Sequence, residues 1–373
     1  MERRRHEHEA RLMAIYSGLR RMLFALEAET SHDFALAALA GASRSRIATA
    51  LLAKCNRRRD LPRKVMGINF PNPVGLAAGL DKRARACNAL HALGFGWVEL
   101  GAVTPLPQPG NPKPRIFRLP EQHALINRMG FNSGGLASFV RNLARAAPGI
   151  IKGVNIGKNA ATAMDDAHAD YAACMEAVHM HADYISVNIS SPNTQGLRDL
   201  QEEGALAPLL AALNRKRGEL AEASGRRVPL VLKIAPDLGG GALDALAGVA
   251  RKHRIDGIAA TNTTLSRDGV GHALAGEVGG LSGAPLGARA TETVARLSRN
   301  LQGEIPIIGV GGIDSAEDAL EKFEAGAELV QIYTGFIYRG PRLIGEIIER
   351  LRARQARPAE KNVHSANPKA RCA

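Results

Sequence analysis

The residues best suited to chemistry are polar side chains that follow short apolar runs rich in Val, Ile and Ala. Any one of these groups could be a satisfied loop cap, but that explanation fits all of them together poorly. They are Gly79, Asp81, Lys82, Asn155, Lys158, Asn188-Ile189-Ser190-Ser191-Pro192-Asn193, Lys233, Thr261-Asn262-Thr263-Thr264, Gly309-Val310-Gly311-Gly312 and Tyr333-Thr334-Gly335.

The residue types in these groups predict an anionic ligand that carries a phosphate. Lys82 and Lys233 would face one cavity, where their repulsion and desolvation disfavour both charges unless anions neutralise them. Gly311 and Gly312 would let the backbone approach a phosphate closely, although glycines there could also serve only a tight turn. Five carboxamides that both donate and accept suit a heterocycle with alternating C=O and N–H groups. They are Asn127, Asn155, Asn188, Asn193 and Asn262.

Metal and hydrolytic chemistry have little support in the sequence. There is no His-x-Glu zinc pattern and no convincing Ser-His-Asp set, so we expect no metal site. His123, His179 and His181 lie in expected loops or helices and are interpreted as surface residues. The four cysteines have no paired spacing, which argues against structural zinc or a disulfide framework and favours a reducing, cytoplasmic compartment. They are Cys55, Cys87, Cys174 and Cys372.

Eight apolar runs, separated by helical patterns, must position these side chains. Strands that alternate with helices predict a parallel sheet, and eight such units predict a closed (β/α)₈ TIM barrel whose active site lies at the carboxyl ends of the strands. An open doubly wound sheet is the alternative, but no strand precedes a G-x-G-x-x-G turn. The runs are Val74–Ala78, Trp97–Gly101, Gly153–Ile156, Tyr184–Ile189, Leu230–Ile234, Gly257–Thr261, Ile305–Val310 and Leu329–Tyr333.

The rest of the chain divides by composition. Residues 1–16 are a charged leader expected to be disordered, 17–60 a short N-terminal helical extension, 61–351 the barrel, and 352–373 a basic tail expected to be disordered. Amphipathic helices in the extension could lie on a membrane or equally could cap the barrel bottom. The connection between residues 101 and 153 is rich in proline, so it cannot be one plain helix, and we expect it to fold over the barrel mouth.

Bulk composition excludes few functions. The 373 residues are 45% hydrophobic and 23% charged, which is enough to bury a large core. A formal charge of +13, concentrated toward both ends, suits a solvated surface or anionic lipid headgroups better than nucleic acid. No apolar run approaches eighteen residues and no secretory signal is apparent, so we expect no membrane span.

Four motifs resemble the dihydroorotate dehydrogenase family, in the right order and over residues 16 to 350. Together they are highly specific. They are Gly75-Leu76-Ala77-Ala78-Gly79-Leu80-Asp81-Lys82, Asn127-Arg128-Met129-Gly130-Phe131-Asn132, Asn188 through Asn193 with Thr194, and Ile307-Ile308-Gly309-Val310-Gly311-Gly312-Ile313.

The resemblance implies FMN as cofactor and dihydroorotate or orotate as ligand. FMN would contact Ala78, Gly79, Lys82, Ala102, Asn155, Asn188, Lys233, Thr261, Gly283, Gly312, Tyr333 and Thr334. The pyrimidine would contact Lys82, Asn127, Met129, Gly130, Phe131, Asn188, Asn193, Asn262 and Thr263. Ala102 stands where similar enzymes often carry Ser or Thr.

The resemblance also implies a mechanism and an electron acceptor. Ser191 would remove a proton from C5 while hydride passes from C6 to the flavin, and Thr194 and Phe131 would shape the proton relay to a water. The cytosolic class carries cysteine at the base position, so Ser191 implies the class that reduces a membrane quinone in pyrimidine biosynthesis. The extension would form an apolar quinone tunnel on an anionic membrane surface, at the cytoplasmic face of the inner membrane. The quinone would contact His32, Arg118 and Tyr333.

Three other functions remain open on the sequence alone. Another FMN barrel oxidoreductase acting on a different acid need not share Asn127, Asn193 and Asn262. A basic nucleic-acid-binding protein on a barrel scaffold would bind DNA in a salt-dependent way and hold no flavin. A lyase or isomerase that uses the same phosphate site would be colourless.

Overall fold

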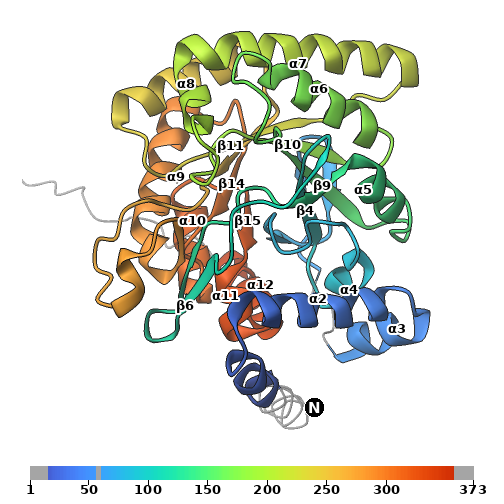
Figure 1. Ribbon diagram of the computed structural model, residues 1–373, viewed down its shortest axis with the longest axis vertical. Coiled ribbons are helices and arrows are strands. Elements are labelled where there is room, and N and C mark those ends of the chain that lie inside the picture. The colour runs from blue at the N-terminus through green and yellow to red at the C-terminus, as the bar shows by residue number, and fades with distance from the viewer. Residues whose placement is uncertain (1–15, 56–59, 357–373) are drawn as a thin grey trace, which may run out of the picture.

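The computed structural model describes residues 16–55 and 60–356, and eight parallel strands in it close into a barrel (Figure 1). The ring closes because β15 pairs with β3, which excludes the open-sheet alternative. All eight expected strands are confirmed. They are β3 (Val74–Leu76), β4 (Trp97–Val103), β9 (Ile151–Ile156), β10 (Tyr184–Asn188), β11 (Leu230–Ile234), β12 (Gly257–Ala260), β14 (Ile307–Val310) and β15 (Leu329–Ile332).

Helices surround the barrel and connect its strands. They are α4 (Cys87–Ala92), α5 (Gly135–Leu143), α6 (Ala167–Val178), α7 (Glu203–Ser224), α8 (Gly240–Lys252), α9 (Gly287–Leu301), α10 (Ala316–Glu324), α11 (Thr334–Arg339) and α12 (Arg342–Ala356). Short 3₁₀ turns are η1 (Pro120–Gln122), η2 (Leu197–Gln201), η3 (Ala273–Gly276) and η4 (Ala284–Leu286). Helix α12 continues five residues past 351, into the segment expected to be a disordered tail. The leader up to residue 15 and the segment 357–373 lie outside the described residues.

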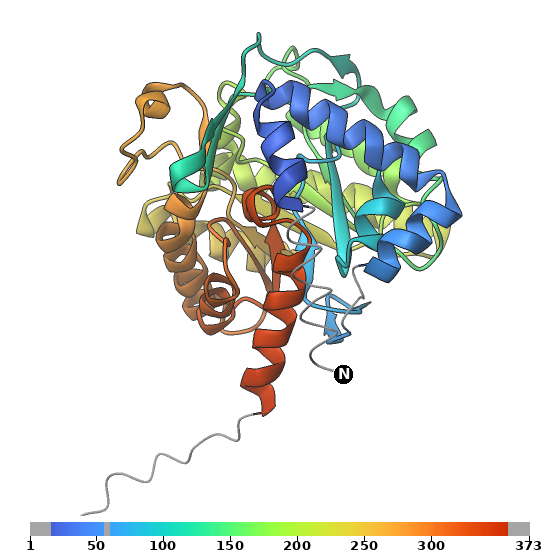
Figure 2. The same cartoon turned by 90° about the horizontal axis from the view of Figure 1, so that it is seen from below.

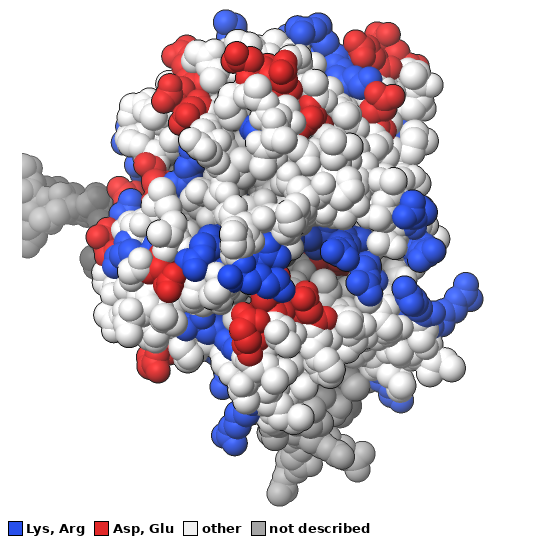
Figure 3. Space-filling view, in the orientation of Figure 1, with Lys and Arg blue, Asp and Glu red and all other residues white. Residues whose placement is uncertain are grey.

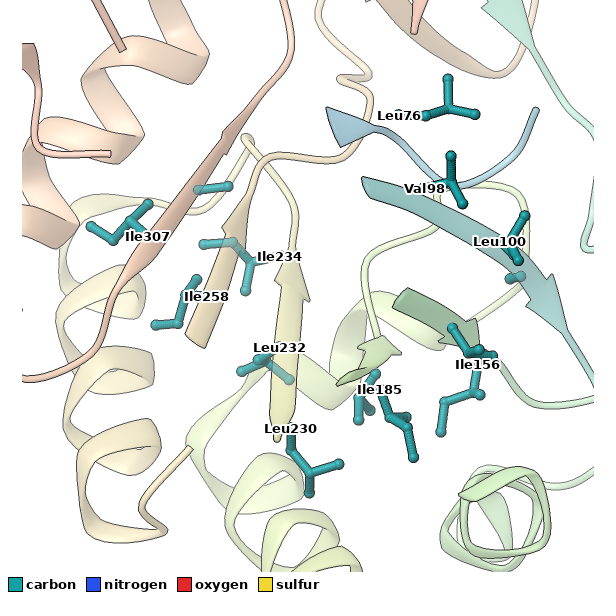
Figure 4. Packing of buried hydrophobic residues seen from close by; sticks show 14 of the residues in the cluster. Leu76, Val98, Leu100, Ile156, Ile185, Leu230, Leu232, Ile234, Ile258 and Ile307 are labelled. Carbon is teal, nitrogen blue, oxygen red and sulfur yellow. The ribbon is translucent and has the colours of Figure 1, made fainter. Parts of the chain in front are cut away.

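Alternation along each strand separates the helix-facing core from the barrel interior. In β11, Leu230, Leu232 and Ile234 pack outward toward the helices (Figure 4), whereas Val231 and Lys233 belong to the interior. Successive strand residues point to opposite faces, so a polar residue between the outward-facing Leu232 and Ile234 must point into the barrel. This alternation delivers Lys233 to the cavity described below.

Large side chains fill the amino-terminal half of the barrel. Trp97 and Tyr184 occupy space that is free only because their neighbours are glycines. A Cβ on Gly75 would lie 2.1 Å from the Trp97 ring, and one on Gly153 would lie 2.2 Å from the Tyr184 ring. A bulky inner layer of this kind makes the barrel a packed core rather than a pore.

A strand pair closes the barrel bottom and the N-terminal helices lie elsewhere. The pair is β1 (Arg63–Val65) with β2 (Ile68–Phe70), and the Phe70 ring packs edge-on against Trp97 at 4.9 Å. Residues 16–24 are helical, followed by α2 (Ala28–Ser43) and α3 (Arg46–Cys55). Helix α2 contacts β6 and lies at the opposite end from β1 and β2 (Figure 2). The possibility that these helices cap the barrel bottom is therefore wrong.

The connection between β4 and β9 forms additional sheets near the mouth. Strands β6 (Ile116–Leu119), β7 (Ala124–Asn127) and β13 (Gly280–Gly283) form one antiparallel sheet, and β5 (Pro107–Gln108) pairs with β8 (Ser133–Gly134). As expected, the connection is not one helix. In the described part of the chain, no helix combines the length and apolar character that crossing a bilayer requires.

Candidate active site

A cavity at the carboxyl ends of the barrel strands gathers nearly all the residues that sequence analysis assigned to ligands. Strand ends, their loops and α2 all contribute to it. Those lining it are His32, Ala78, Gly79, Lys82, Ala102, Asn127, Met129, Gly130, Phe131, Asn155, Asn188, Ser191, Asn193, Lys233, Thr261, Asn262, Thr263, Gly283, Gly312, Tyr333 and Thr334. Residues far apart in the chain thus converge on one space, as in other barrels.

Several candidates do not line the cavity, among them Arg118, Thr194, Lys158, Asp81, Ser190 and Thr264. Arg118 stacks over the Phe24 ring at 4.7 Å and donates to the Leu23 carbonyl oxygen at 3.2 Å, so it ties the first helix to β6. Thr194 lies in the turn before η2, where its carbonyl oxygen accepts from the Leu197 N–H at 3.2 Å. The Lys158 and Asp81 side chains bond nearby backbone groups, which makes them loop-stabilising residues.

Carboxamides form a connected series along one side of the cavity. Asn188 Nδ2 donates to Asn155 Oδ1 at 3.0 Å, and Asn262 Nδ2 donates to Asn188 Oδ1 at 3.3 Å. Across the mouth, Asn193 Nδ2 donates to Asn127 Oδ1 at 3.2 Å. These bonds orient the amides, and each amide keeps hydrogen-bonding capacity for a heterocycle.

Two lysines bring positive charge into the cavity. Burial lowers the pKa of Lys82 to about 8, and its ammonium donates to Asn132 Oδ1 at 2.6 Å. Burial also lowers the pKa of Lys233, which is 5% exposed. Within residues 16–55 and 60–356, Lys233 makes no side-chain hydrogen bond or ion pair. An unpaired buried ammonium is costly, so an anionic ligand would stabilise it.

Glycines form a narrow backbone cradle at the ends of β13 and β14. Gly311 and Gly312 have φ of +104° and +74°, in the left-handed region that favours glycine. A Cβ on Gly312 would lie 2.1 Å from Gly287 Cα, at the start of α9. No other residue fits this close approach, which leaves backbone groups free to meet an anion.

Ser191 lies in the loop after β10, against the cavity. Its side chain is buried, and its hydroxyl oxygen accepts from the Asn193 N–H at 3.3 Å. Among the described residues, no Asp, Glu or His side chain hydrogen-bonds this hydroxyl. A proton taken up by Ser191 would therefore have to leave through solvent or ligand.

His123 and His179, which lie outside the cavity, have structural partners. His123 Nδ1 lies 2.7 Å from Asp314 Oδ2, and its ring stacks on Tyr338. The interpretation of His179 as a surface residue is wrong, because it is 3% exposed and bonds Ser224 Oγ at 2.8 Å. His181 is half-buried after α6. In the part of the chain that the structure describes, no group of three His, Cys, Asp or Glu side chains could hold a metal ion.

Two interior residues near the site escaped sequence analysis. Gln331 lines the cavity from within β15, and Glu99 lies fully buried in β4. Each of them points into the barrel from its strand, and its two neighbours along the strand are buried apolar residues that point outward. That alternation is the signal that could have identified them, since polar residues in buried strands are rare without a partner.

Comparison with known proteins agrees with this geometry. The dihydroorotate dehydrogenase family model matches residues 60–354. The chain belongs to the dihydroorotate dehydrogenase family. A relative from Flavobacterium lutescens, named dihydroorotate dehydrogenase (quinone), is 52% identical over 353 residues, which cover 94% of this chain and 100% of the relative. A relative from Chromobacterium violaceum with the same name is 53% identical, covering 89% of this chain and 96% of the relative.

A solved dihydroorotate dehydrogenase has the same fold. The Eimeria tenella enzyme in complex with ferulenol is 38% identical to this chain, with a TM-score of 0.76. The alignment covers 87% of this chain and 90% of the Eimeria protein. A ligand-free structure of that enzyme aligns with a TM-score of 0.75 at 40% identity, covering 81% of this chain and 92% of the other. The resemblance read from four motifs is thus confirmed at the level of family and fold.

Proposed function

We propose that the chain oxidises dihydroorotate to orotate in pyrimidine biosynthesis, with FMN as cofactor and a quinone as electron acceptor. The observation that carries the proposal is the convergence of two lysines and five carboxamides on one cavity. Orotate is a small anion with alternating C=O and N–H groups, which this combination matches. Family membership favours the same substrate.

The residues around the glycine cradle fit FMN. Gly312 and Gly283 bring backbone groups to the cavity, where they would meet a phosphate, and Lys233 offers an ammonium to the same cavity. Thr334 Oγ1 donates to Ser282 Oγ at 2.8 Å, which links the start of α11 to β13. When bound, FMN supplies an acceptor for hydride, and the surrounding side chains orient it and tune its electronics. The residues that we propose to contact FMN are the same twelve that were named from the sequence.

The residues at the mouth fit the pyrimidine. Lys82 would bind its carboxylate, while Asn127, Asn193 and Asn262 would pair with its carbonyl and N–H groups. Ser191 would receive the proton removed from the substrate carbon. Thr194 follows Ser191 closely in the same loop, and Phe131 lines the cavity, so both would shape the path by which that proton leaves.

The quinone assignment rests on His32 and Tyr333, which both line the cavity. Burial lowers the pKa of His32, so this imidazole is neutral at pH 7 and presents one donor and one acceptor. Arg118 would act at the entrance, beside Phe24 on the first helix. From these residues we expect the quinone path to run between α2 and the barrel.

The visible absorption spectrum tests substrate and cofactor together. The purified protein would be recorded anaerobically before and after dihydroorotate is added, and we expect a yellow flavin band that bleaches. A yellow protein that dihydroorotate does not bleach would retain FMN but point to a different acid. A colourless protein, still empty after FMN is supplied, would overturn the oxidoreductase assignment and favour a lyase or isomerase.

We also propose peripheral contact with an anionic membrane at the cytoplasmic face of the inner membrane. The N-terminal helices expose Met22, Phe34, Ile47 and Leu51, between 58% and 76% each. A groove between α3, α4 and the end of α5 has four arginines and no acidic residue in its lining. They are Arg44, Arg46, Arg85 and Arg145. Figure 3 shows that basic side chains form a band across this view of the molecule. Apolar side chains beside basic ones suit a lipid interface.

Vesicle sedimentation tests the membrane proposal. We expect binding to phosphatidylcholine vesicles only when phosphatidylglycerol is included, with about 1 kcal/mol lost for each arginine removed. The test variant replaces Arg44, Arg46 and Arg145 with Gln. Its matched control replaces three other exposed arginines with Gln. They are Arg215 on α7, Arg254 after α8 and Arg299 on α9. Equal losses in both triple variants would show that only net charge matters and would contradict this surface.

A further inference from the structure

A buried carboxylate lies beneath the cavity and has no role in the function proposed above. Glu99 occupies an inward position of β4 and is 0% exposed. A carboxylate is rarely buried so completely without paired charges or several hydrogen bonds. The complete burial of this carboxylate therefore needs a physical explanation.

Three polar groups from the barrel interior donate hydrogen bonds to Glu99, and a fourth supports one of them. Its Oε2 accepts from the Tyr184 hydroxyl and from Gln331 Nε2, both at 2.7 Å. Its Oε1 accepts from Asn155 Nδ2 at 2.8 Å. The Tyr184 hydroxyl in turn accepts from Trp97 Nε1 at 3.1 Å. Charged acceptors form the stronger hydrogen bonds, so this arrangement fixes each of these donors in one orientation.

One of these donors connects Glu99 to the cavity. Because Asn155 Nδ2 is held by Glu99, its Oδ1 faces the Asn188 amide, which donates to it at 3.0 Å. Asn188 Oδ1 then accepts from Asn262 Nδ2 at 3.3 Å. Each hydrogen bond in this series therefore fixes the orientation of the next amide, from Asn155 beside Glu99 to Asn262 in the cavity.

Glu99 also opposes the positive charge of the cavity. Its charge acts on Lys233, for which no ion pair within 4.0 Å is present among the described residues. The two groups therefore interact through space across the barrel interior, where low polarisability strengthens charge interactions. Removing the carboxylate charge would leave the positive charge of Lys233 unopposed in the cavity where FMN would bind.

We propose that Glu99 is a positioning residue that orients the Asn155–Asn188–Asn262 series and, through its charge, lowers the redox potential of the bound flavin. Reduction adds negative charge to the flavin, and a nearby carboxylate disfavours that charge while Lys233 favours it. The balance between Glu99 and Lys233 would therefore set how readily the flavin accepts electrons and passes them on. The inference rests on FMN binding as proposed above.

Spectroelectrochemical titration of the holoenzyme tests the charge effect, with Glu99→Gln as the first variant. This substitution keeps the shape of the side chain, and Gln331 Oε1 lacks a partner among the described residues, so a rotated Gln331 amide could accept from the new donor. We expect the midpoint potential to rise by about 30 mV or more, which is a tenfold change for a two-electron couple. Tyr184→Phe is the matched control, because it removes a hydrogen bond to the same oxygen while keeping the charge. Its potential should stay near that of the unaltered protein.

Glu99→Asp separates orientation from charge and covers the case in which Glu99→Gln does not retain flavin. The shorter side chain keeps the charge but withdraws from Asn155, so we expect an unchanged potential and orotate binding weakened about tenfold. A potential that does not rise in Glu99→Gln, or that rises equally in Tyr184→Phe or Glu99→Asp, would overturn the proposal. A flavin-free unaltered protein would instead refute the proposed function, which keeps the two failures distinct.

Discussion

Lys82 links protonation to ligand binding at the scale of a single residue. Its pKa of about 8 means that the ammonium loses its proton just above physiological pH when the cavity is empty. Since only the charged form attracts a carboxylate, the dissociation constant for orotate should rise about tenfold per pH unit above pH 8. Fluorescence titration of orotate between pH 7 and 9.5 measures it. Lys82→Met should bind weakly at every pH, and a flat profile in the unaltered protein would contradict this role.

Ser191 carries the proton-transfer step in the proposed function. Ser191→Ala leaves no oxygen to receive the proton, so flavin reduction by dihydroorotate should slow by about 10²–10⁴-fold. Anaerobic stopped-flow absorbance measures that half-reaction. FMN content should not change, because Ser191 is not assigned to the cofactor. Near-normal flavin reduction in this variant would remove Ser191 as the base.

At the scale of elements, an ion pair attaches α2 to the connection over the mouth. Glu29 on α2 and Arg115 before β6 are both buried, with Arg115 Nη2 2.7 Å from Glu29 Oε1. The side chain of Lys113, which is 62% exposed, reaches the same oxygen at 3.2 Å. Helix α2 also carries His32. The ion pair would therefore hold in position the helix that forms one wall of the proposed quinone path.

Breaking that pair should affect stability and quinone reduction together. Glu29→Ala leaves a buried guanidinium unpaired, which costs roughly 3–5 kcal/mol. We expect a lower melting temperature and a larger loss of quinone reduction than of flavin reduction by dihydroorotate. Lys113→Met is the control, since an exposed partner contributes about 0–1 kcal/mol. Similar losses in the two variants, or equal losses in both half-reactions, would count against this attachment.

At the scale of the whole molecule, the cavity is built from all eight barrel strands or the loops that follow them. Ligand binding should therefore stabilise the barrel as one unit. Ligand at a hundred times its dissociation constant contributes about 2.7 kcal/mol, so removing FMN should lower the melting temperature of a chain of this length by roughly 3–4 °C. Calorimetry of holo and flavin-stripped protein measures it. A melting temperature unaffected by FMN would show that the cofactor does not bind in this cavity.

Sequence by itself determined the barrel strands and the family. Each strand is a short apolar run bounded by polar or glycine residues, a local signal that does not depend on distant contacts. Gly311 and Gly312 predicted a close approach of the backbone but left a tight turn as the alternative, because glycine tolerates a left-handed backbone in either role. The four motifs identified the family, since each is contiguous in the chain.

Only the tertiary structure decided which polar side chains share a space. Ring closure sets which strand faces point inward, and this revealed Glu99 and Gln331 within otherwise apolar runs. The tertiary structure also gives two of the proposed quinone residues different positions. His32 lines the cavity, whereas Arg118 bonds the first helix. Lys158 follows a strand just as Lys82 does, yet it bonds its own loop. These outcomes depend on contacts between residues far apart in sequence, which local patterns do not encode.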